Sequence, residues 1–103
     1  MTVIARFEVI PVRDGSLAEE IARAVDALEE FGVSYELTAT DTVVEADHVD
    51  EVFDAVKAAH DAVDGDRVIT SLEVDEHRSR EQDAEDRVES VASVLGREPK
   101  RTA

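Results

Sequence analysis

The sequence predicts an α+β fold in which two helices cover one face of a four-stranded antiparallel sheet. Segments whose apolar residues alternate with period two are interleaved with segments of helical period, and 103 residues fit one domain. The apolar residues are mostly Ala and Val, with only three Phe and one Tyr. We therefore expect a thin core to which a second subunit would add contacts.

The first third of the chain reads as a strand followed by a helix. Residues 2–12 alternate with period two, which predicts a strand. The letters SLAE indicate a capping box, in which the Ser16 hydroxyl accepts the backbone N–H of Glu19. Apolar residues then recur at helical spacing from 17 to 31, and Gly32 suits the left-handed position after a helix.

The middle of the chain predicts a hairpin and a second helix. Residues 33–40 and 42–46 read as two strands joined by a turn at Asp41. Asp47 is positioned to cap the helix that follows, which ends near Gly65. Its expected apolar stripe consists of Val49, Val52, Phe53, Val56, Ala59 and Val63.

The last third predicts a strand at 67–74 and a third helix near 83–95. The element order is then β-α-β-β-α-β, the ferredoxin-like arrangement, with an extra C-terminal helix. We expect one domain over residues 1–96 and a disordered tail over 97–103, which has no apolar pattern. The third helix has a narrow stripe of Val88, Val91, Ala92 and Leu95, which suits packing on its own subunit and a contact between subunits equally.

The alternation also predicts which side chains lie on each face of the sheet. The helices would cover Val3, Phe7, Tyr35, Leu37, Leu72 and Val74. The other face would stay open and carry a mixture of polar and apolar side chains: Ile4, Arg6, Glu8, Ile10, Ser34, Glu36, Thr38, Val43, Glu45, Ile69, Ser71 and Glu73.

The charge of the chain is strongly negative along its whole length. There are 26 acidic residues against nine Arg and two Lys, for a formal net charge of −15. Such charge opposes compaction by self-repulsion, and molar salt screens it. The composition predicts an acidic surface of the halophilic type, and an acidic protein of an ordinary cytoplasm is the alternative.

The composition disfavours several classes of function. Phosphate-based binding of nucleic acid needs clustered Lys and Arg, and the excess of acidic residues over these cations disfavours it. The chain has no Cys and no apolar run long enough for a membrane span, and Met1 opens directly into a strand without the features of a signal peptide, so we expect a cytoplasmic protein. An acidic surface suits a cationic ligand better.

The open face is the first candidate site. Its hydroxyls and carboxylates suit a heteroaromatic amine or a cation, and its apolar side chains would form flat walls. A solvated sheet face is the plain alternative, because Thr is a good strand former.

Metal binding and catalysis have weaker support. His48, His60 and His77 lie far apart and form no recognised ligand spacing with the nearby acids, so we expect no specific metal site. No G-x-S-x-G elbow, Cys nucleophile or Gly-rich phosphate loop occurs. We therefore expect no enzyme and no cofactor, although the sequence leaves catalysis open.

Nearly the whole chain resembles the thiamine-binding protein family of small, YkoF-like, ferredoxin-fold proteins. The matching stretches include VIARFEVIPV, SLAEEIARAV, DEVFDAVKAAHDAV, RVITSLEVDEHR and EDRVESV. The hairpin YELTATDTVVEAD is the most specific part, because family members read Y-E-L-T-P-M-G-T followed by an acidic residue. Ala39, Thr40 and Asp41 replace the usual Pro, Met and Gly, which makes this stretch more polar.

The resemblance implies a homo-oligomer, a dimer or a tetramer assembled through the sheets, that captures thiamine or its aminopyrimidine portion. A carboxylate would neutralise the thiazolium cation, and hydroxyls would serve the aminopyrimidine. The residues that we expect to bind the ligand are Thr38, Thr42, Glu45, Glu36, Ser71 and Glu8. An acidic regulatory or scaffolding module that binds a protein partner is the alternative.

Overall fold

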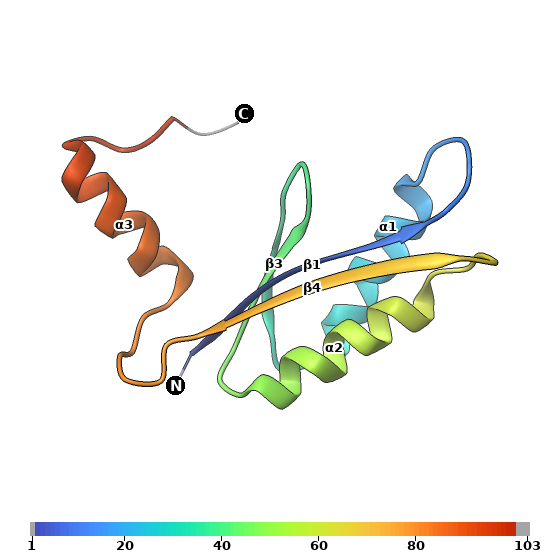
Figure 1. Cartoon of the computed structure of the whole chain (residues 1–103), viewed down its shortest axis with the longest axis horizontal. Coiled ribbons are helices and arrows are strands. Elements are labelled where there is room, and N and C mark those ends of the chain that lie inside the picture. Colours follow the sequence, from blue (N-terminus) through green and yellow to red (C-terminus); the bar gives the residue numbers. More distant parts are fainter. Residues whose placement is uncertain (1, 101–103) are drawn as a thin grey trace.

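The computed structural model describes residues 2–100 and has the predicted element order (Figure 1). The strands are β1 (Val3–Pro11), β2 (Ser34–Leu37), β3 (Thr42–Ala46) and β4 (Val68–Glu76), and the helices are α1 (Ala18–Asp26), the 3-10 helix η1 (Ala27–Glu30), α2 (Val49–Ala62) and α3 (Ala84–Leu95). All neighbouring strands are antiparallel, in the order β2-β3-β1-β4. The ferredoxin-like prediction is confirmed.

The register of β1 decides which side chains reach the core. Val3, Phe7 and Val9 are at most 4% exposed, and Phe7 lies opposite Thr42 of β3 and Leu72 of β4. The alternate residues of all four strands form the open face, as the alternation predicted. A shift of one residue in any strand would exchange its faces.

The core lies between this sheet and the layer of α1, η1 and α2. Leu28 of η1, Val44 of β3 and Val52 of α2 are completely buried. Among residues 2–100, Phe7 is the only aromatic side chain that is buried, and Phe31 packs against the core from its edge. Small residues therefore fill most of the core, as the composition predicted.

Three apolar residues that the sequence assigned to the core are exposed instead. Phe53 is 53% exposed, and the buried stripe of α2 consists of Val52, Ala55, Val56 and Ala59. Tyr35 and Leu37 point toward the helix side, yet they are 36% and 57% exposed. The reason is that β2 is the edge strand, which the helices cover only in part.

The predicted starts of the first two helices are wrong in detail. The Ser16 hydroxyl accepts from the N–H of Ala18 at 3.3 Å, so the capping box with Glu19 does not form. Glu19 pairs with Arg23 at 3.2 Å instead. His48, and not Asp47, is the N-cap residue of α2, and no side chain caps this helix.

The end of the first helical segment also differs from the prediction. The α-helix tightens into η1, and Phe31 then turns to extended backbone at φ −114°. The chain therefore leaves the helix without the left-handed conformation that was predicted for Gly32.

Two further segments have shorter structure than the sequence suggested. Only Ser34–Leu37 of the predicted strand 33–40 pairs with β3, because the chain turns at Thr38. Residues 97–100 form neither helix nor strand, and residues 101–103 of the predicted disordered tail lie outside the described part. The helix α3 stands beyond the end of β1 and β4, away from the layer of α1 and α2 (Figure 1).

Candidate functional site

The open face of the sheet contains a hollow at the centre of β1 and β4. The register puts Arg6 opposite Glu73, and Glu8 opposite Ser71. The hollow has a volume of about 200 Å³ and is lined by Arg6, Phe7, Glu8, Asp41, Ser71, Leu72 and Glu73. We call it the central hollow. It brings together two of the six predicted binding residues, Glu8 and Ser71.

Carboxylates surround the only cation that lines the central hollow. The Arg6 guanidinium donates to both carboxylate oxygens of Glu73, at 3.3 and 3.2 Å, and lies 3.6 Å from Asp41. The hydrogen bond to Glu73 and the charges of both acids raise the pKa of Arg6 above its ordinary value. Arg6 therefore stays charged, and its charge is already balanced by the protein.

Glu8 is different from the other acids of the hollow. Its side chain is exposed on the open face, and its carboxylate makes no hydrogen bond or ion pair with any residue in the range 2–100. Ser71, directly opposite on β4, offers a hydroxyl that both donates and accepts. The pair presents one uncompensated negative charge beside one adaptable hydrogen-bonding group.

Glu36 and Glu45 line a second hollow of about 200 Å³, farther along the open face. Its other lining residues are Ser34, Tyr35, Val43, Ala84 and Glu85. Glu45 is partly buried and accepts a hydrogen bond from the backbone N–H of Ala84, at the start of α3. Its negative charge therefore stabilises the positive end of that helix, while Glu36 lies exposed on the edge strand.

Thr38 holds the turn between β2 and β3. Its hydroxyl donates to the Asp41 carboxylate at 2.8 Å and accepts the backbone N–H groups of Asp41 and Thr40, at 3.1 and 3.3 Å. No described residue other than glycine has a positive φ, so this turn closes without the usual Gly. Because its hydroxyl is hydrogen-bonded to Asp41, Thr38 holds the Asp41 carboxylate beside Arg6.

Thr42 lies on the other side of the sheet from the central hollow. It is 5% exposed and sits opposite Phe7, in the layer that the helices cover. The structure thus separates the six predicted residues into Glu8 with Ser71, Glu36 with Glu45, Thr38 in the turn, and Thr42 in the buried layer.

Sequence reasoning did not select Arg6, Asp41 and Glu73 as site residues. The face prediction had already placed Arg6 and Glu73 on the open face, and the available signal was their opposite charges on one face of the sheet. The position of Asp41 depends on the geometry of the turn, which the letters ATD do not reveal.

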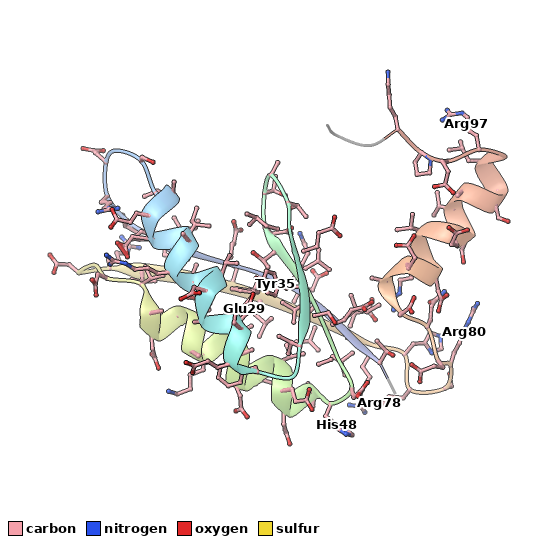
Figure 2. All side chains as sticks on the ribbon, turned by 180° about the vertical axis from the view of Figure 1, so that it is seen from behind. Glu29, Tyr35, His48, Arg78, Arg80 and Arg97 are labelled. Carbon is pink, nitrogen blue, oxygen red and sulfur yellow. The ribbon has the colours of Figure 1, made fainter. Side chains whose placement is uncertain are left out.

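Two titratable side chains outside this face have partners in other elements. The Tyr35 hydroxyl donates to Glu29, which lies beside it in Figure 2, and this hydrogen bond raises the pKa of Tyr35. His60 Nδ1 lies 2.5 Å from the Thr70 hydroxyl. Among residues 2–100, no three His, Asp or Glu side chains are grouped as metal ligands, and none of the helices in this range has the length and apolar character needed to cross a membrane.

Sequence comparison now identifies the family. The model of the family described as thiamine-binding protein matches residues 5–92. The chain belongs to this family. A UPF0045 protein from Methanothermobacter thermautotrophicus is 42% identical over 98 residues, which cover 90% of this chain and 99% of that protein. A UPF0045 protein from Methanocaldococcus jannaschii is 32% identical over 95 residues, which cover 89% and 94%.

Solved structures support the same fold for this member of the thiamine-binding protein family. The crystal structure of a hypothetical protein from Methanocaldococcus jannaschii superposes with a TM-score of 0.82 at 32% identity, covering 88% of this chain and 96% of that one. A putative thiamine biosynthesis/salvage protein from Thermotoga maritima superposes with a TM-score of 0.74 at 26% identity, covering 88% and 99%.

Proposed function

We propose that this protein binds thiamine, or a related cationic heteroaromatic molecule, in the central hollow, without catalysing a reaction. The observation that carries the proposal is the charge of the hollow. Arg6 is balanced by Glu73 and Asp41, whereas the Glu8 carboxylate has no partner among residues 2–100. An uncompensated carboxylate favours a cation and disfavours an anion.

The chemistry of a thiamine-like ligand matches this arrangement. The thiazolium ring carries a permanent positive charge, which Glu8 is placed to neutralise. The aminopyrimidine ring needs donors and acceptors, which Ser71 supplies. Ile10 and Ile69, paired across β1 and β4 next to Glu8 and Ser71, offer an apolar edge against which a ring can lie.

The size of the hollow supports assembly into a homo-oligomer. Its volume of about 200 Å³ is below the roughly 300–1,000 Å³ of typical small-molecule sites. We infer that a second copy, packed against the open face in a dimer or tetramer, completes the site. In that assembly Glu36 and Glu45 add negative charge at the second hollow, and Thr38 acts indirectly by holding Asp41.

Titration calorimetry in molar salt tests the proposal. We expect thiamine to bind the wild-type protein, and Glu8→Gln to weaken binding by about 10- to 100-fold, the loss of one charge-assisted contact. Glu30→Gln is the matched control, because Glu30 is an exposed glutamate on η1. Thiamine phosphates should bind more weakly than thiamine, since their phosphate meets carboxylates.

Three results would count against this function. No heat with thiamine, its phosphates or the free aminopyrimidine would exclude the ligand class. An equal loss in Glu8→Gln and Glu30→Gln would place the site elsewhere. Turnover of a thiamine precursor would identify a salvage enzyme instead of a binding protein.

A further inference from the structure

The helix α3 is well defined but has little contact with the rest of the chain. The side chains of Asp83 and Asp86 cap its first turn reciprocally, at 2.8 and 3.1 Å, and Gly96 ends it at φ 80°. Polar contacts join its first turns to the sheet: Arg87 pairs with Asp75 of β4, and the Ala84 N–H donates to Glu45 of β3. Figure 1 shows the rest of the helix pointing away from the sheet.

One face of α3 exposes apolar side chains. Val91 is 61% exposed, Val94 is 92% exposed and Leu95 is 45% exposed. Together with Ser90 these residues line a shallow groove along the helix. A helix of 12 residues is marginal in water on its own, so an exposed apolar stripe on such a helix indicates a missing partner.

We propose that α3 pairs antiparallel with α3 of a second copy of this chain. The stripe of Val88, Val91 and Leu95 has intervals of three and four residues, the spacing by which two helices interlock. Ser90 at the groove is small and donates its hydroxyl to the Asp86 carbonyl at 2.9 Å. A close approach of two helices there therefore buries no unpaired hydroxyl.

Charge favours this occupant and this orientation. Residues 97–103 contain three cations and one acid, whereas the preceding 96 residues contain eight cations and 25 acids. The first turn of α3 is acidic, with Glu85 and Asp86. An antiparallel pair places the acidic start of one helix beside Arg97 and Lys100, which follow Gly96 of the other helix, and the helix dipoles also oppose each other.

The open sheet face of a second copy is a poorer partner for α3. That face exposes Glu8, Glu36 and Glu73, which would meet the acidic first turn of α3. A pair of short helices is a small interface, so we expect it to depend on protein concentration. The proposal concerns α3 alone and does not depend on the ligand.

Disulfide trapping tests the pairing, because the natural chain has no Cys. In a two-fold antiparallel pair centred on the stripe, Val91 lies near the two-fold axis and faces Val91 of the second copy. Mild oxidation of Val91→Cys should give a covalent dimer at least ten times faster than oxidation of Ser93→Cys. Ser93 is exposed on the opposite side of the same helix and is the matched control.

A second variant measures assembly without oxidation. Val91→Asp should lower the mass measured by light scattering, while Ser93→Asp should leave that mass unchanged. Both variants should keep the far-ultraviolet circular dichroism of the wild type, which shows that they still fold. Equal trapping rates at positions 91 and 93 would overturn the proposal. A mixture of the Val91→Cys and Ile69→Cys variants gives a further test. If the disulfide between positions 91 and 69 formed faster than the disulfide between two copies of Val91→Cys, α3 would lie on the sheet of the second copy and the proposal would be wrong.

Discussion

The turn at Thr38 offers the sharpest test of how this sequence builds its site. Replacing Thr38 by Ala removes one hydroxyl that donates to Asp41 and accepts two backbone N–H groups, while Thr38→Ser keeps the hydroxyl. Each such hydrogen bond contributes about 0.5–1.5 kcal/mol net, but Thr38 is exposed and water replaces part of the loss. We therefore expect Thr38→Ala to lower the free energy of unfolding by about 1–2 kcal/mol.

Chemical denaturation in molar salt measures this loss of unfolding free energy directly. In a thermal melt, a loss of that size lowers the melting temperature by roughly 4–16 °C in a chain of this length. Thr38→Ser should lose less than half as much. Binding of thiamine should weaken in Thr38→Ala as well, because Asp41 is no longer held beside Arg6.

A double-mutant cycle with Asp41→Ala then separates the side-chain pair from the backbone contacts. The two losses should not be additive, because the Thr38 hydroxyl donates to the Asp41 carboxylate at 2.8 Å. A change in stability below about 0.3 kcal/mol for Thr38→Ala, or equal losses for Thr38→Ala and Thr38→Ser, would refute the assignment of this hydroxyl to the turn.

Three further predictions follow from the charges of the chain. With a net charge of −15, the melting temperature should rise from low to molar salt, and an unchanged value would exclude the halophilic interpretation. Glu45→Gln should speed hydrogen exchange in the first turn of α3, since the carboxylate accepts from the Ala84 N–H; unaltered exchange would show that this contact does not hold the helix. The hydrogen bond from Arg87 lowers the pKa of Asp75 below its ordinary 3.8. The contact between Asp75 and Arg87 therefore stabilises the folded protein at pH values above the ordinary pKa, and this stabilisation is lost as the pH falls through the lowered pKa of Asp75. Hydrogen exchange in α3 should rise over that pH range in the wild type and not in Asp75→Asn.

Much of the fold was predictable because the periodicity of the sequence is regular. The period-two pattern of residues 2–12 predicted the faces of β1, and the same alternation predicted the faces of β3 and β4. The errors arose where local signals compete. Ser16 and Asp47 are good capping residues by type, yet the chain enters α1 and α2 one residue later than these residues require. Exposure of Tyr35 follows from the edge position of β2, which no local pattern encodes.

The candidate site was predictable only in part. The projection of faces put Glu8 and Ser71 on the same face of the sheet, and the register of the structure places them opposite each other. It did not indicate that Arg6 would be balanced by Glu73 and Asp41, which is what leaves Glu8 as the uncompensated charge. Thr42 was selected from the hairpin letters, but its position opposite Phe7 puts it under the helices.

Amide chemical shifts recorded during a thiamine titration in molar salt test the central claim most directly, because they locate the ligand residue by residue. Binding at the central hollow should move the resonances of Arg6, Glu8, Ser71 and Glu73, with smaller changes at Asp41. Resonances of α2 on the far side of the sheet should stay in place. Shifts confined to the helices, or no shifts at any thiamine concentration, would contradict the account.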